Sequence, residues 1–304
     1  MTWRTSANKA AAFAAMIVMA AMLPRPVAAH DIVQYENVSS FERTIQQGQT
    51  TRKVLYLHPT QAAGSGKVPV IYLLTYLNGV SADMADLTGV AALVRDYGIW
   101  VILPQSANGS WAPGIIGGPS DVPFLSSLIA GDLASYPLDP AHVYMAGYSD
   151  GATMTESFAC AHAEQVAAIG IVGMTESSFN IPPCKPTHPV SVVFADGTDD
   201  HETAYNGGLL TQSFAATQKF WAALDDCTAP PQTTTPAPAV NDGTSIRLDA
   251  YTGCAGGSGM NFYTVNGGGH TWPGTLSYSP VLGVDSRNLN ATAAFWQFFQ
   301  SHSR

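Results

Sequence analysis

The chain has few charged residues, and basic residues are the scarcer kind. Among its 304 residues, 13 are Lys or Arg and 22 are Asp or Glu, which gives a formal net charge of −9. Such a chain lacks the basic surface through which proteins bind nucleic acids and anionic membranes. We therefore expect a protein that binds neither nucleic acid nor a membrane surface.

The chain also lacks an apolar run long enough to cross a membrane. Residues 10–23 form an uncharged apolar stretch, but its length of about 14 residues falls short of the roughly 20 that a span needs. The stretch follows the basic residues Arg4 and Lys9 and precedes the small residues 27–29. This order is typical of a secretory signal peptide. It predicts cleavage after residue 29, a mature chain of residues 30–304, and secretion to the periplasm or the extracellular space.

Cysteine is sparse as well. The chain contains four cysteines, with no C-x-x-C pair among them, and its histidines are scattered. This pattern argues against a zinc site, and we expect no bound metal. An even number of cysteines in an exported chain argues for two disulfides, for which three connectivities exist. We predict the nearest-neighbour pairing, Cys160–Cys184 and Cys227–Cys254.

Apolar runs typical of buried strands alternate with segments of helical periodicity, and no internal repeat interrupts them. Strands are expected over residues 52–59, 68–74, 99–103, 142–147, 166–172, 190–194 and 261–265. Helices are expected over residues 86–97, 124–136, 152–159, 213–224 and 288–299. Alternating strands and helices predict a mostly parallel sheet covered on both faces. We expect a single domain over residues 30–304, with the Pro/Thr-rich residues 228–243 as a surface insertion.

One short motif within this α/β pattern contains a candidate nucleophile. Residues 147–151 read G-Y-S-D-G, between an apolar strand and a helical segment. In this context a G-x-S-x-G turn presents its serine, here Ser149, as a nucleophile. A serine hydroxyl reacts at neutral pH only beside a base and beside donors that stabilise an oxyanion.

Two downstream segments can supply the base and its acid. The strand over residues 190–194 leads into Asp196, Asp199 and Asp200, so three carboxylates are available after this strand. His270 lies in the glycine-rich segment G-G-G-H-T-W-P-G, between the last expected strand and the final helix. Acid and then histidine is the order in which α/β-hydrolases place these groups after the serine.

Residues 144–155, 197–200 and 267–274 together resemble the secreted polyhydroxybutyrate-depolymerase and feruloyl/acetylxylan esterase family of α/β-hydrolases. The resemblance extends over about residues 50–300, and G-G-G-H-T-W-P-G is its most specific element. The positions of Cys160, Cys227 and Cys254 also fit the family layout. The resemblance implies an α/β-hydrolase fold and a catalytic triad of Ser149, Asp200 and His270.

The chain departs from this family where the first oxyanion donor is expected. The family carries His-Gly after its first buried strand, and this chain has Thr75-Tyr76 at the matching place. An ungapped match makes the N–H of Leu77 the first donor, and a shifted match makes it that of Val80. The second donor, the N–H of Asp150, follows from the geometry of the turn.

The resemblance implies a serine esterase that needs no cofactor and acts through an acyl-enzyme. Its first implied substrates are polyhydroxyalkanoate-type polyesters or their oligomers, and the alternative is a feruloyl or acetyl ester of plant polysaccharide. The same triad would also serve a serine peptidase or polyamide hydrolase, and a scaffold without turnover would act as a secreted binding protein. Trp272, two residues after His270, is expected either to line the substrate pocket or to anchor the loop by packing.

Overall fold

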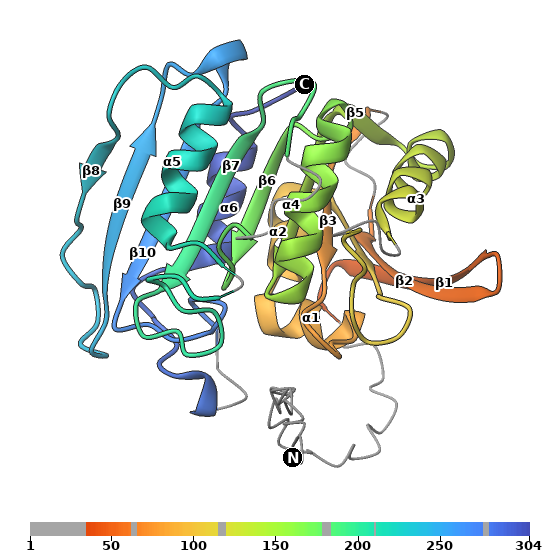
Figure 1. Cartoon of the computed structure of the whole chain (residues 1–304). Coiled ribbons are helices and arrows are strands. Elements are labelled where there is room, and N and C mark those ends of the chain that lie inside the picture. Colours follow the sequence, from red (N-terminus) through yellow and green to blue (C-terminus); the bar gives the residue numbers. More distant parts are fainter. Residues whose placement is uncertain (1–34, 62–65, 115–119, 178–183, 210, 276–279) are drawn as a thin grey trace, which may run out of the picture. The chain divides into compact units, whose positions relative to one another are not determined.

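The computed structural model describes residues 35–61, 66–114, 120–177, 184–209, 211–275 and 280–304. The predicted signal peptide, residues 1–29, lies outside the described residues. Contacts group the described residues into one unit, in which strands alternate with helices in the middle of the chain and follow one another directly near its two ends (Figure 1).

Most of the expected helices and strands are present, in the expected order along the chain. The strands are β1 (Val38–Gln47), β2 (Thr50–Pro59), β3 (Val68–Leu74), β4 (Trp100–Pro104), β5 (Leu138–Tyr148), β6 (Ala168–Val172), β7 (Ser191–Gly197), β8 (Gln232–Thr234), β9 (Ser245–Tyr251) and β10 (Met260–Asn266). The α-helices are α1 (Ser81–Thr88), α2 (Ala91–Tyr97), α3 (Val122–Ser135), α4 (Asp150–His162), α5 (Phe214–Leu224) and α6 (Ala291–Phe299).

All the described strands join one sheet in the order β1-β2-β4-β3-β5-β6-β7-β10-β9-β8. The six strands from β4 to β10 pair in parallel, and antiparallel strands extend the sheet at both sides. The predicted fold class is therefore confirmed: a mostly parallel sheet of the α/β-hydrolase type.

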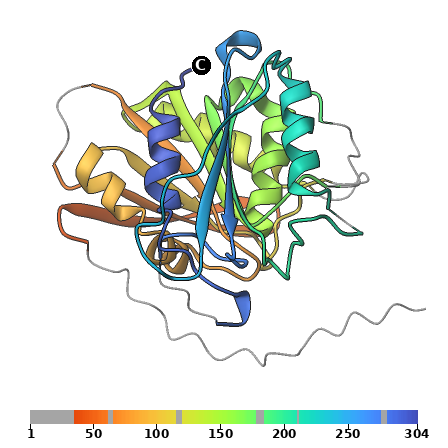
Figure 2. The same ribbon diagram turned by 90° about the vertical axis from the view of Figure 1, so that its left-hand side faces the viewer.

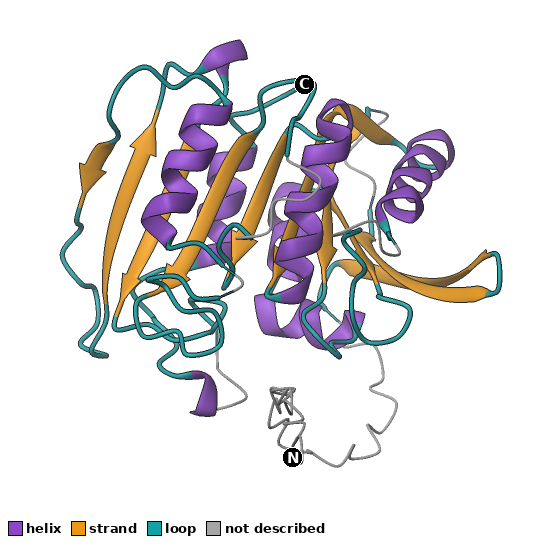
Figure 3. Ribbon diagram, viewed as in Figure 1, coloured by secondary structure: helices purple, strands orange, loops and turns teal. Residues whose placement is uncertain are grey.

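Helices cover both faces of this sheet because alternate strand residues point to opposite sides. In β3, Val70 and Tyr72 pack in the core that α3, α4 and α5 close. Ile71 and Leu73 pack in the core that α1, α2 and α6 close. Figure 2 views the sheet along its edge, with α5 and α6 on opposite sides, and Figure 3 separates helices, strands and loops by colour.

Some predicted elements differ from the structure. The helix expected over residues 86–97 is two helices, α1 and α2, because the chain turns at Gly89, where φ is +61°. Gly98 ends α2 as expected, with φ of +67°. Strands β1, β8 and β9 were not predicted, and β8 lies within the expected insertion over residues 228–243. Strands β1 and β8 have no buried residue and β9 has only two, so all three lack the continuous apolar run of a central strand.

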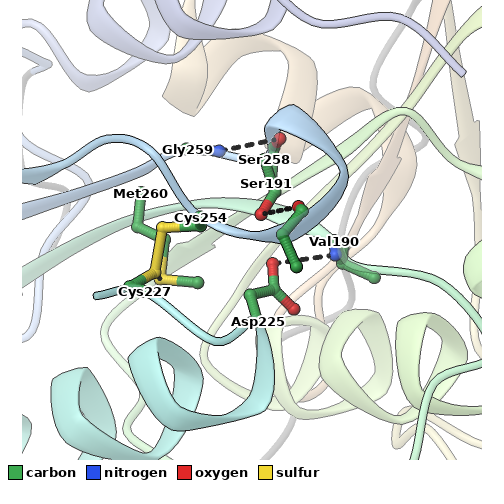
Figure 4. Close-up of a disulfide and its surroundings, with 9 residues drawn as sticks. Val190, Ser191, Asp225, Cys227, Cys254, Ser258, Gly259 and Met260 are labelled. Atoms are coloured by element: carbon green, nitrogen blue, oxygen red, sulfur yellow. Dashed lines mark hydrogen bonds between the residues drawn. A yellow bond between two sulfur atoms is a disulfide. The ribbon is translucent and has the colours of Figure 1, made fainter. Parts of the chain in front are cut away.

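Two disulfides join the chain where the parallel strands begin. They are Cys160–Cys184 and Cys227–Cys254, the predicted pairs. Figure 4 shows the second beside Asp225, whose side chain accepts a hydrogen bond from the N–H of Val190 at 3.0 Å. Among the helices described, none is both long and apolar enough to span a membrane.

Candidate active site

Ser149 sits in a sharp turn between β5 and α4. Its backbone adopts φ of 55° and ψ of −117°, and its N–H donates to the carbonyl of Val172 at 2.9 Å. The two glycines of the motif are required by close packing. A Cβ at Gly147 would lie 2.1 Å from the carbonyl oxygen of Gly151, and one at Gly151 would lie 2.5 Å from that of Leu74. The turn therefore holds the serine in a strained backbone conformation, at the carboxyl end of its strand.

His270 lies against this serine. Its Nε2 is 3.0 Å from Ser149 Oγ, and its Nδ1 is 2.7 Å from Asp200 Oδ2. The histidine loop is fixed from two sides, because the N–H of His270 donates to the carbonyl of Leu282 at 2.7 Å and the hydroxyl of Tyr148 donates to the carbonyl of His270 at 2.6 Å. The imidazole thus bridges a hydroxyl and a carboxylate, as a general base requires.

Asp200 is the carboxylate that reaches the histidine. It is buried in the turn after β7 and accepts hydrogen bonds from the N–H groups of Glu202 and Thr203, both at 2.8 Å. The Thr203 hydroxyl lies 2.9 Å from Asp200 Oδ2 and 3.3 Å from His270 Nδ1. These contacts hold the carboxyl group in place against the imidazole, where it can orient the ring.

The other two aspartates have different surroundings. Asp199 is exposed and bonded to the hydroxyl of Thr198. Asp196 is buried, and within the described part of the chain neither of its carboxyl oxygens has a hydrogen-bond partner. Burial, reinforced by the charge of Asp200, raises the pKa of Asp196 well above its usual range. Of the three candidates, Asp200 alone is hydrogen-bonded to His270.

The predicted oxyanion donors come from two segments that meet at the elbow. The carbonyls of Leu74 and Thr75 pack against Gly151, which brings the segment after β3 beside the start of α4. In that segment the N–H of Asn78 is bonded to the carbonyl of Gly109 and the N–H of Gly79 to that of Tyr76. The N–H of Asp150 belongs to the first turn of α4, where N–H groups have no partner within the helix. We retain Leu77 and Asp150 as the predicted donors.

Trp272 packs as an anchor. It is 2% exposed, its indole N–H donates to the hydroxyl of Thr292 at 2.9 Å, and its ring contacts Tyr148 and Phe295. A side chain this deeply buried does not line a surface that a substrate can reach. The pocket role considered for Trp272 is therefore corrected to a packing role.

Sequence reasoning missed two residues that touch the triad. Thr203 contacts both Asp200 and His270, and Tyr148 fixes the backbone of His270. Thr203 lies three residues after the acid, without a motif of its own. Tyr148 occupies the variable second position of G-x-S-x-G, so its partner on another loop leaves no local signal.

The fold is of the α/β-hydrolase type, and Ser149, His270 and Asp200 lie in contact at one end of its parallel strands. No cluster of three or more potential metal ligands occurs among the described residues.

Comparisons with known proteins place the chain near esterases of this fold, and no family model matches it. It is 26% identical to Feruloyl esterase B of Piromyces equi over 72% of this chain, and 28% identical to a protein named Probable feruloyl esterase C of Aspergillus clavatus over 66%. The chain spans 42% and 63% of these two relatives, respectively.

Solved structures show the same fold. An acetyl xylan esterase from Aspergillus awamori aligns with a TM-score of 0.58 at 19% identity, covering 77% of this chain and 94% of that one. A thermostable esterase aligns with a TM-score of 0.57 at 12% identity, covering 88% and 64%. The resemblance to feruloyl and acetylxylan esterases is thus confirmed, whereas none of these relatives is named a polyhydroxybutyrate depolymerase.

Proposed function

We propose that this protein is a serine esterase that hydrolyses carboxylic esters through an acyl-enzyme. The observation that carries the proposal is the continuous contact from Ser149 through His270 to Asp200, at 3.0 and 2.7 Å. Side chains from three separate loops meet there in the order that nucleophilic catalysis by serine requires.

In the proposed reaction, Ser149 Oγ attacks the ester carbonyl while His270 Nε2 accepts the hydroxyl proton. Asp200 holds Nδ1–H and stabilises the imidazolium that forms. The tetrahedral intermediate then collapses, the carbon–oxygen bond to the alcohol breaks, and His270 gives the proton to the departing alkoxide. Water attacks the acyl-enzyme by the same route, releases the acid and restores Ser149.

For the substrate we propose an acyl ester of plant polysaccharide, with a feruloyl or acetyl group. Similarity to a feruloyl esterase and to an acetyl xylan esterase supports this class. Two exposed apolar side chains near the triad support an apolar acyl group. Leu77 follows β3, and Val284 lies beside the histidine loop, because its carbonyl accepts the N–H of Gly269. A polyhydroxyalkanoate oligomer, implied by the histidine motif, is the competing substrate.

We also propose that the protein is exported and folds as one catalytic domain after cleavage at residue 29. Two disulfides support this compartment, because such bonds persist in oxidising surroundings.

The test begins with a fluorophosphonate probe on the wild-type protein and on Ser149→Ala. Labelling of the wild type alone, located to Ser149 by peptide mapping, supports an activated serine. An unlabelled wild type points instead to a binding protein without turnover. Hydrolysis rates on methyl ferulate, p-nitrophenyl acetate, a hydroxybutyrate oligomer and a peptide anilide then rank the substrates. A preference for the oligomer or the anilide overturns the polysaccharide-ester proposal.

A further inference from the structure

The residue after the nucleophile carries a carboxylate that the triad does not use. Asp150 Oδ2 accepts the backbone N–H of Trp111 at 2.7 Å, and Oδ1 is 3.3 Å from the hydroxyl of Ser110. Burial raises the pKa of Asp150, and the bonds from Trp111 and Ser110 oppose that shift. The side chain thus ties the elbow to the chain segment of residues 109–111, some 40 positions earlier.

The same segment also holds the chain after β3, where the first oxyanion donor is predicted. The indole N–H of Trp111 donates to the carbonyl of Thr75 at 2.9 Å, and the N–H of Asn78 donates to the carbonyl of Gly109 at 2.5 Å. Contact here is close, because a Cβ on Gly109 would lie 2.3 Å from Asn78 Oδ1 and φ at this glycine is +83°. Segment 109–111 therefore touches the chain on both sides of Leu77.

The segment itself is anchored in the rigid part of the fold. Trp111 is 3% exposed and shares its core cluster with Leu74 and Ala152. The adjacent residue, Ala112, is bonded to Asp121 through both its N–H and its carbonyl. Asp121 pairs in turn with the buried guanidinium of Arg52 on β2. A segment fixed in this way can set the distance between the two chain regions that it contacts.

We propose that Asp150 and Trp111 are positioning residues that hold the two halves of the oxyanion hole in register. The inference rests on the proposed esterase function. An oxyanion hole stabilises a transition state only when its donors are already oriented, since reorganisation during the reaction would cost the advantage. One donor belongs to the elbow and the other follows β3, so a bridge between these segments fixes their relative placement. The Asp150 side chain bonds to this bridge, and the Asp150 N–H is itself a predicted donor.

The experiment compares Asp150→Ala, Asp150→Asn and Trp111→Phe with the wild type. Alanine removes the acceptor, asparagine keeps an acceptor oxygen without the charge, and phenylalanine keeps an aromatic ring without the indole N–H. We expect Asp150→Ala to lower kcat about tenfold with KM within about twofold, a fraction of the 10²–10³ that loss of a whole donor costs. The Asp150→Asn variant should keep most of the wild-type kcat, and Trp111→Phe should lower kcat several-fold.

A second readout separates positioning from a merely structural role. A trifluoromethyl ketone adds to the serine and places its oxyanion in the hole, so its affinity should fall in parallel with kcat/KM across the variants. In the double variant Asp150→Ala/Trp111→Phe, the fold-decrease in kcat/KM should be much smaller than the product of the two single fold-decreases, because both residues act through one segment. Asp96→Ala, which removes an exposed carboxylate paired with Arg95 on α2, is the matched control and should behave as the wild type.

Three results would overturn the proposal. They are a kcat for Asp150→Ala within twofold of the wild type, an asparagine variant no better than the alanine variant, and inhibitor affinities that do not follow kcat/KM. If Asp150→Ala does not fold, as judged by its thermal transition, Trp111→Phe takes its place. A kcat within twofold of the wild type, or an inhibitor affinity that does not follow kcat/KM, then overturns the proposal. A wild type that fluorophosphonate does not label defeats the proposed function, whereas a labelled wild type with unaffected variants defeats this inference alone.

Discussion

The carboxyl-terminal edge of the parallel strands carries Ser149, Asp200 and His270, whereas the amino-terminal edge carries both disulfides. At the first edge, loops are held by hydrogen bonds such as that from Tyr148 to the carbonyl of His270. At the second, Cys160–Cys184 and Cys227–Cys254 join the ends of helices to the segments entering the sheet. Covalent cross-links thus stabilise the fold away from the side chains proposed to react.

Within the site edge, two buried aspartates four residues apart differ in their hydrogen-bond partners. Asp200 is surrounded by donors from Glu202, Thr203 and His270. Asp196, the next-to-last residue of β7, is buried without such donors, and burial raises its pKa. Burial without donors favours the neutral form of an acid. Substitutions at the two aspartates and at the two edges test these contrasts.

The largest effect should follow from Asp200→Asn. The amide preserves the shape of the turn but cannot hold His270 in the required tautomer. We therefore expect kcat to fall by a factor of about 10³–10⁴ with folding intact. Ester hydrolysis by this variant, by Asp199→Asn and by Asp196→Asn is compared at one pH. A larger loss at position 196 or 199 would refute the assignment of Asp200.

Replacing Cys227 and Cys254 together by alanine should act on stability and spare the reaction. The bond closes a loop of sequence separation 27, and in the chain-entropy model such a loop contributes on the order of 3 kcal/mol. Urea unfolding measures the loss, and kcat of the folded variant should stay within about twofold of the wild type. An activity loss without a stability loss would contradict the separation of the two edges.

Thr203→Val tests a hydrogen bond at the site edge. Valine has nearly the same shape but lacks the hydroxyl that lies 2.9 Å from Asp200 Oδ2. Because one hydrogen bond contributes about 0.5–1.5 kcal/mol, we expect kcat to fall by up to about tenfold. Thr203→Ser keeps the hydroxyl and serves as the control. Equal activity of the valine and serine variants would show that the hydroxyl does not support the acid.

The smallest effect on activity is expected for Asp196→Asn, whose signature is instead pH-dependent stability. The raised pKa of Asp196 means that the folded state keeps a proton that the unfolded chain releases above about pH 4. Wild-type stability should therefore fall as pH rises from there, and the asparagine variant should lack this contribution. Unfolding free energies of both proteins at pH 4, 6 and 8 provide the measurement. A difference between them that does not change with pH would contradict a neutral Asp196.

Elements whose signal is local could be predicted from the sequence. The central strands appear as continuous apolar runs, because a strand buried on both faces needs no polar residues. The elbow appears as G-Y-S-D-G, because close packing admits only glycine at positions 147 and 151. The edge strands β1 and β8 and the adjacent strand β9 were not predicted, because their residues are mostly half-buried or exposed and their pairing depends on a neighbouring strand.

The sequence by itself thus determined the α/β pattern, the nucleophile turn, the histidine loop and a pairing of cysteines that the structure contains. Only the tertiary structure decided which of three aspartates lies against His270, that Thr203 and Tyr148 support the site, and that Trp272 is buried. It also revealed that Asp150 and Trp111 bridge the two segments of the predicted oxyanion hole. The reason is physical: apolar periodicity and glycine turns reflect local backbone demands, whereas these contacts join residues far apart in the chain, and no short segment records its distant partner.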